Sequence, residues 1–230
     1  MQNSDETCRK GAAPPSRHRG RPRAFDREAA LAQAMRLFWT RGYEATSIAD
    51  LTAAMGIGAP SLYAAFGSKE ALYVEALEHY TRSYECLAWA GFRAAATARE
   101  AIAALLFDSA ASLTGCVADI PHGCMVTLAS VDCEEHRALG DHLRLSRAGG
   151  LEQLTARLAR GVAEGDLPAG LDCQALARFL QAVQAGMSLL ARDGVGRAEL
   201  EAVAELALQG VDARLAAAAS GGRAPFSPRP

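Results

Sequence analysis

The chain has 230 residues, 50% of them hydrophobic and 22% charged, a composition typical of a soluble globular protein and not of a disordered or fibrous one. Its net charge of −2 is unevenly divided, because residues 1–69 carry a net charge of +4 and residues 70–230 a net charge of −6. No segment has the roughly eighteen apolar residues of a membrane helix and none resembles a signal peptide, so we expect no membrane partner and a cytoplasmic protein whose six cysteines are reduced.

Residues 1–24 combine Gly, Pro, Ser and basic residues without a hydrophobic period, which predicts a flexible basic arm. The arm ends in Arg-His-Arg-Gly-Arg-Pro-Arg, an extended segment that carries Arg19, Arg21 and Arg23. Arginines on an extended segment can follow the minor groove of DNA, where the negative potential is deepest over A·T steps. The alternative is a solvated basic tail.

Residues 26–42 form an amphipathic pattern that predicts a first helix, and residues 46–70 predict two short helices joined by a turn. Ser47 is a natural N-cap, and Asp50 three residues later completes a capping box. Gly56 and Gly58 then allow a sharp turn, and Pro60 is tolerated in the first turn of the next helix. This arrangement is a helix-turn-helix.

The outer face of the second short helix is small, hydroxylated and aromatic, as Ser61, Tyr63 and Ala64 show. Such a face suits the major groove of DNA, because it must approach the edges of the bases closely. Ser68 caps the helix that follows, so we expect Lys69 at its start to meet a phosphate. The predicted DNA-contacting residues are Arg19, Arg21, Arg23, Thr46, Ser47, Gly58, Ala59, Ser61, Tyr63, Ala64 and Lys69.

Residues 29–72, which include Ala-Met-Arg-Leu-Phe-Trp-Thr-Arg-Gly-Tyr-Glu-Ala-Thr-Ser-Ile and Gly-Ala-Pro-Ser-Leu-Tyr-Ala-Ala-Phe-Gly-Ser-Lys-Glu-Ala-Leu-Tyr, closely resemble the tetracycline-repressor (TetR) family of transcription regulators. The resemblance covers about a fifth of the chain. It implies a ligand-responsive regulator, a repressor that binds a palindromic operator as a dimer and is released by a small effector. It also implies a DNA-binding domain at residues 25–70 and an effector-binding and dimerisation domain at residues 71–219.

The remainder of the chain is predicted to be helical, with helices at about 69–90, 98–114, 124–134, 135–164, 172–192 and 197–218. Gly149 and Gly150 mark a weak point inside the fourth of these. No segment alternates with period two for long enough to form a strand, so the predicted fold is all-α. Residues 220–230 are predicted to be a disordered tail.

The last two predicted helices carry apolar stripes with small residues beside them. One interpretation is a hairpin packed on the core of the same chain, which must hold in part. The resemblance implies in addition a four-helix interface between two copies of the chain. The predicted interface residues are Leu176, Leu180, Val183, Met187, Leu190, Leu200, Val203, Ala207 and Val211.

The resemblance places an effector pocket between these regions, and we expect it to be largely apolar. Side chains of this type also form ordinary core. The candidate lining residues are Tyr84, Trp89, Phe92, Phe107, Cys116, Met125, Phe179 and Met187.

Two cysteine-based alternatives remain open. His122, Cys124, Cys133 and His136 could bind zinc, although a helix would place the two cysteines on opposed faces. Thiol sensing by Cys116, Cys124 or Cys133 would need a lowered thiol pKa, which the neighbouring acidic residues disfavour.

No nucleophile motif, phosphate-binding loop or paired carboxylates are present, so we expect neither an enzyme nor a cofactor. A further alternative is a helical architectural protein that binds DNA without sequence preference.

Overall fold

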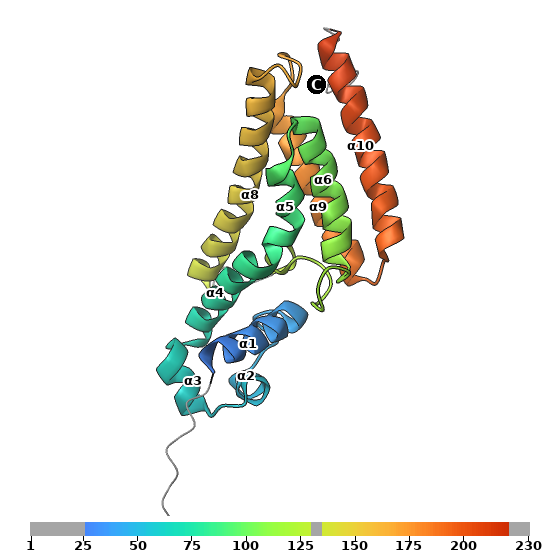
Figure 1. Ribbon diagram of the computed structural model, residues 1–230. Coiled ribbons are helices and arrows are strands. Elements are labelled where there is room, and N and C mark those ends of the chain that lie inside the picture. The colour runs from blue at the N-terminus through green and yellow to red at the C-terminus, as the bar shows by residue number, and fades with distance from the viewer. Residues whose placement is uncertain (1–25, 130–134, 221–230) are drawn as a thin grey trace, which may run out of the picture.

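The computed structural model describes residues 26–129 and 135–220, and every regular element within them is helical (Figure 1). The predicted all-α fold is therefore confirmed. The predicted arm with Arg19, Arg21 and Arg23, and the predicted tail beyond residue 220, lie outside the described residues. The elements are α1 (Arg27–Arg41), α2 (Ile48–Met55), α3 (Ala59–Phe66), α4 (Lys69–Tyr80), a π-helical segment η1 (Thr81–Glu85), α5 (Cys86–Ala94), α6 (Ala98–Leu113), α7 (Met125–Leu128), α8 (Arg137–Ala163), α9 (Cys173–Arg192) and α10 (Arg197–Ala219).

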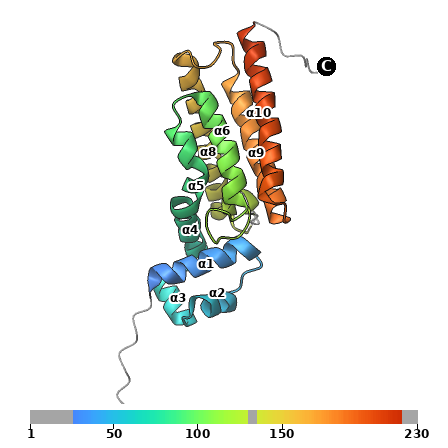
Figure 2. The ribbon, with the colours of Figure 1, turned by 45° about the vertical axis from the view of Figure 1, so that its right-hand side comes forward.

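The turn between α2 and α3 is set by local chemistry, as the sequence predicted. Ser47 and Asp50 form a capping box at the start of α2, in which each side chain binds the other residue's backbone N–H. Gly56 ends α2 with a φ of 66°, a left-handed conformation that glycine adopts without steric cost. Helices α1 to α3 form a compact unit at one end of the molecule, while α5, α6, α8, α9 and α10 form a bundle at the other (Figures 1 and 2).

Helices α4 and α5 are joined without a break, but the junction is not α-helical. The sequence predicted one α-helix over residues 69–90, whereas residues 81–85 adopt the wider π-helical turn η1 before α5 continues to Ala94. Two other helices also differ from expectation. The predicted helix at 124–134 is only the single turn α7, and residues 130–134 are not described. Helix α8 runs through Gly149 and Gly150 without interruption.

The core of the N-terminal unit does not stop at residue 70. Ile120, Met125, Val126, Leu139 and Leu143 pack into the same cluster of buried residues as the apolar side chains of α1 to α4. A second cluster fills the bundle between α5, α6, α8, α9 and α10. The hydrophobic core therefore joins the two parts of the molecule instead of separating them.

A polar joint reinforces this junction. The indole N–H of Trp39 donates to the carbonyl of Gly123 at 3.1 Å, and Arg192 at the end of α9 donates to the carbonyl of Trp39 at 2.8 Å. Gly123 has a φ of 80°, and an added Cβ would lie 2.8 Å from the carbonyl oxygen of Ser188, so the position requires glycine. None of the helices within residues 26–129 and 135–220 is long and apolar enough to cross a membrane.

The contact between α5 and α6 gives a test of the packing. Gly91 donates its N–H to Asp108 at 3.2 Å, and a Cβ on Gly91 would lie 2.9 Å from the Cβ of Ala104. We expect Gly91→Ala to push the helices apart and to lower the free energy of unfolding by about 1–3 kcal/mol in chemical denaturation.

Gly149→Ala is the matched control, because Gly149 is also helical but an added Cβ there would meet nothing within 4 Å. It should raise the free energy of unfolding by about 0.5–1 kcal/mol, since alanine favours a helix over glycine. Equal effects of the two substitutions would contradict the close packing of α5 on α6.

Candidate functional site

The outer face of α3 is the first candidate site. Leu62 and Phe66 are buried against the N-terminal core, which leaves Ser61, Tyr63 and Ala64 exposed to solvent. Tyr63 is the large side chain on this face, with 48% of its surface accessible. Gly58 is the N-cap of this helix, and it has no side chain to satisfy the first backbone N–H groups. The exposed start and face of α3 match the requirements of a groove-reading helix.

The other predicted contact residues near this face have different environments. Ser47 is exposed at the start of α2, and Ala59 is half-buried in the first turn of α3. Thr46, by contrast, is fully buried, and its hydroxyl donates to the carbonyl of Gly42 at 2.6 Å. Thr46 thus supports the loop before α2 and has no accessible surface in this structure.

Lys69 begins α4 beside α3. Its ammonium group lies 4.1 Å from the centre of the Tyr43 ring, a cation–π contact. Burial lowers the pKa of Lys69, an effect that the negative charge of Glu44 opposes. Burial and the charges of Glu70 and Glu44 raise the pKa of Tyr43 to about 12. A ring nitrogen of His136, just before α8, lies 2.7 Å from Glu70, so the start of α8 adjoins this charged group of residues.

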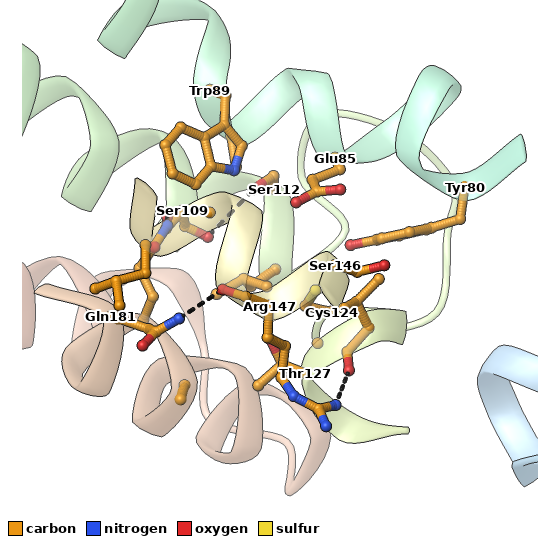
Figure 3. Close-up of a pocket in the computed structure, with 18 of the residues that line it drawn as sticks. Tyr80, Glu85, Trp89, Ser109, Ser112, Cys124, Thr127, Ser146, Arg147 and Gln181 are labelled. Carbon is orange, nitrogen blue, oxygen red and sulfur yellow. Dashed lines mark hydrogen bonds between the residues drawn. The ribbon is translucent and has the colours of Figure 1, made fainter. Parts of the chain in front are cut away.

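The second candidate site is a cavity of about 610 Å³ in the bundle (Figure 3). One wall comes from α4, η1 and α5, and the others come from α1, α6, residues 120–127, α8 and α9. The lining includes Trp39, Tyr80, Tyr84, Glu85, Trp89, Ser109, Ser112, Cys124, Thr127, Ser146, Arg147, Gln181 and Gln184. A volume of this size can hold a drug-sized molecule.

Glu85 is the carboxylate of this lining. Burial raises its pKa, while a hydrogen bond from Thr81 and the positive charge of Arg93 act in the opposite direction. The pKa of Tyr80 is raised well above its usual value, chiefly by burial and also by its hydrogen bond with Cys124. In Figure 3 the carboxyl group of Glu85 and the hydroxyl end of Tyr80 both point toward the middle of the cavity.

The arginines of the lining have partners within the chain. Arg147 donates to the carbonyl of Val126 at 3.1 Å, and Arg178 donates to the side chain of Gln181 at 2.9 Å. Arg144 is exposed and forms an ion pair with Asp141. The positive groups are thus tied to neighbouring side chains or backbone.

The predicted pocket residues are only partly brought together. Tyr84 and Trp89 line the cavity. Phe92, Met125 and Met187 are buried in the hydrophobic clusters, and Phe107 is half-buried against one of them. Cys116 is exposed, and Phe179, with 43% of its surface accessible, lines a separate hollow of about 300 Å³ on α9 and α10.

Sequence reasoning missed the polar part of the cavity. Glu85, Ser109, Ser112 and Gln184 all lie on helices, where a polar residue is normally assigned to the solvent face. The sequence did contain one signal for Glu85, its position between Tyr84 and Trp89, but the π turn that directs it inward was not predicted.

The predicted interface residues on α9 and α10 are mostly buried within the protomer. Leu190 is exposed and Val183 and Val203 are half-buried. Burial in the protomer's own core accounts for the apolar character of the others, which are Leu176, Leu180, Met187, Leu200, Ala207 and Val211.

Another set of apolar and small residues on α9 and α10 is accessible from outside the protomer. We define the outer face as Phe179, Val183, Gly186 and Leu190 on α9 with Leu206 and Gly210 on α10. The spacing of the α9 residues places them on one side of the helix. Leu206 has 68% of its surface accessible, and a Cβ added at either glycine would meet nothing within 4 Å. Helices α9 and α10 run side by side along one flank of the bundle (Figure 2).

The residues of the two cysteine hypotheses are dispersed. Within the described residues no group of three His, Cys, Asp or Glu side chains is arranged to hold a metal, and Cys133 lies outside them. Cys116 is exposed near Thr114, whereas Cys124 is half-buried in the cavity wall. Thiol sensing stays an untested prediction.

Comparison with known proteins agrees with this architecture. Residues 30–76 match the family described as bacterial regulatory proteins, tetR family. The HTH-type transcriptional repressor ComR of Escherichia coli is 36% identical over 195 residues, which are 83% of this chain and 91% of ComR.

Two solved structures extend the comparison. A cysteine mutant of the TetR family transcriptional regulator CifR, complexed with 26-bp double-strand operator DNA, is 45% identical, with a TM-score of 0.77 over 82% of this chain and 98% of that chain. A TetR transcriptional regulator from Rhodococcus sp. RHA1 is 42% identical, with a TM-score of 0.53 over 79% and 97%. The chain therefore belongs to the TetR family of DNA-binding transcription regulators.

Proposed function

We propose that this protein is a repressor that binds a palindromic operator as a homodimer and is released when a small molecule enters the 610 Å³ cavity. The observation that carries the proposal is the free face of α3, with Ser61, Tyr63 and Ala64 exposed at the end of the molecule away from the bundle. The operator complex of CifR and the repressor ComR support it, because both are similar to this chain over most of its length.

The direct test is selection of bound DNA from a random pool with the full-length protein. We expect one palindromic sequence to be enriched and to bind at least about a thousandfold more tightly than bulk DNA, since each half-site is read by one copy of α3. Equal binding of selected and random DNA would instead indicate an architectural protein.

Lys69 provides a test of the orientation on DNA. It starts α4, where the helix N-terminus favours a phosphate, and its half-buried side chain keeps its ammonium over the Tyr43 ring. We expect Lys69→Ala to weaken binding to operator and random DNA alike and to reduce the salt dependence of the binding constant by about one charge, measured by fluorescence anisotropy at several salt concentrations.

Arg160→Ala is the charge-matched control, because Arg160 is exposed near the end of α8, far along the chain from the helix-turn-helix. It should leave both the affinity and the salt dependence unchanged. An identical salt dependence in Lys69→Ala and the wild type would place Lys69 away from the phosphates.

The outer face of α9 and α10 is the proposed dimer interface. It combines apolar side chains, such as Phe179 and Leu206, with open space at Gly186 and Gly210 where a partner helix can approach closely. A lone recognition helix reads too few bases for selectivity, so a second copy is also required by the DNA-binding function. Stable interfaces of this kind bury more than about 1,000 Å² in total.

Val183 lies in the middle of this face. Val183→Glu should produce monomers that keep their helical content but bind the operator weakly, because an unpaired carboxylate in the contact costs several kcal/mol. Analytical ultracentrifugation and circular dichroism measure both properties.

Leu145→Glu is the control, since Leu145 is an exposed apolar residue on α8, outside the outer face. It should remain dimeric. A dimeric Val183→Glu variant would move the interface to another surface.

The continuous helix from α4 to α5 supports the proposed release. Its first residue, Lys69, adjoins α3, and its later residues Tyr80, Glu85 and Trp89 line the cavity. A ligand that fits the cavity better when this helix shifts would change the separation of the two α3 helices in the dimer. Release then follows from the difference in ligand affinity between the two arrangements.

A further inference from the structure

The cavity combines one carboxylate with a group of aromatic rings. The rings of Trp39 and Tyr80 have centres 4.7 Å apart, those of Trp39 and Tyr84 lie 5.9 Å apart, and Trp89 completes the group in the same lining. Glu85 lies beside them, with its carboxyl group directed into the cavity (Figure 3). A half-buried carboxylate and aromatic faces attract the same kind of ligand, a positively charged one.

We propose that the cavity binds an organic cation, a molecule with an apolar or aromatic body and a positively charged group placed at Glu85. The inference rests on the proposed function only in taking this cavity as the effector site. It names the chemical class of the effector, which the repressor function leaves open.

The environment of Glu85 explains why a cation would bind there. Removing a carboxylate from water is costly unless it is paired, and the raised pKa of Glu85 reflects this cost. A hydrogen bond from Thr81 and the charge of Arg93 compensate it only in part, because burial remains the largest effect. A ligand cation would supply the missing positive charge, while its apolar body would cover the rings of Trp39, Tyr80, Tyr84 and Trp89.

The position of Glu85 depends on the π-helical segment η1. Tyr80 and Glu85 both line the cavity although they are five residues apart, a spacing that the π-helical turn between them, unlike an α-helix, brings to one side. The wider turn thus brings the carboxylate to the same side as the aromatic rings. Such π turns occur often at functional sites.

An organic anion is the competing class, because Arg144, Arg147 and Arg178 also line the cavity. Arg147 is held by the carbonyl of Val126, and the exposed Arg178 is held by Gln181. Arg144 is exposed and paired with Asp141. An anion would have to break these contacts, whereas a cation meets a carboxylate that is already directed inward.

The test uses two ions of the same shape and opposite charge, tetraphenylphosphonium and tetraphenylborate. The chain has two tryptophans, Trp39 and Trp89, and both line the cavity, so quenching of tryptophan fluorescence in the full-length protein reports binding there. The smaller cation benzyltrimethylammonium is measured as well, in case the larger ions cannot enter. We expect the cations to bind and tetraphenylborate to bind about tenfold more weakly or not at all.

Glu85→Gln removes the charge and keeps the shape of the side chain. It should weaken cation binding by about tenfold or more and abolish the preference for the cation over tetraphenylborate. Glu78→Gln is the matched control, because Glu78 lies on the same continuous helix but is exposed and absent from the lining. It should bind both ions as the wild type does.

Three outcomes would overturn the proposal: no cation binding at millimolar concentration, stronger binding of tetraphenylborate, or unchanged cation affinity in Glu85→Gln. Operator binding without any ligand is measured in parallel for each variant. If the wild type binds the operator but shows no preference for the cations over tetraphenylborate, the ligand class is wrong and the repressor function stands. If the wild type does not bind a palindrome, the repressor function fails independently of the ion experiment.

Discussion

The orientation of the DNA-reading unit depends on the hydrogen bonds that Arg192 makes to the end of α1. Its guanidinium donates to the carbonyl of Trp39 at 2.8 Å and to the carbonyl of His122 at 3.0 Å. A cation at a helix C-terminus satisfies carbonyls that have no partner within the helix. Burial lowers the pKa of Arg192, so the contact is made by a group partly withdrawn from water. Arg36 adds a second link from α1, to Asp119. Because Arg192 of α9 binds α1 in this way, the N-terminal unit is tied directly to a helix of the proposed dimer interface.

Trp39 belongs both to this joint and to the cavity wall. Its indole N–H binds Gly123, its backbone carbonyl accepts from Arg192, and its ring lines the cavity. A ligand in the cavity would therefore touch a residue of α1 directly, in addition to the wall formed by α4 and α5. Coupling between the two sites then requires no long chain of intermediate contacts, only a shift of elements that meet at Trp39.

The helix-turn-helix could be predicted from the sequence because its determinants are local. Ser47, Asp50 and Gly56 act within a few residues of one another, and the structure places them as expected. The π turn at residues 81–85 and the shortness of α7 could not be predicted, since both depend on packing between distant segments. The cavity lining was predicted in part, with Tyr84 and Trp89, because an apolar residue on a helix can face a cavity or a filled core equally well. The same ambiguity affected α9 and α10, where Leu180 and Val211 serve the protomer's own core, whereas Phe179 and Leu206 remain open.

The π-helical segment also fixes a rotational relationship. From Lys69 to Ala94 the chain is one uninterrupted helical rod, with the charged residues beside α3 at one end and the cavity wall at the other. An α-helix turns by about 100° per residue, whereas the wider turn of η1 accommodates an extra residue, so η1 contributes to the angle at which Glu85 and Trp89 stand relative to Lys69. The rotation about the helix axis between Lys69 and the cavity-lining residues is set by the number of residues between them. The cavity wall thus depends on the length of this helix as much as on the identity of its side chains.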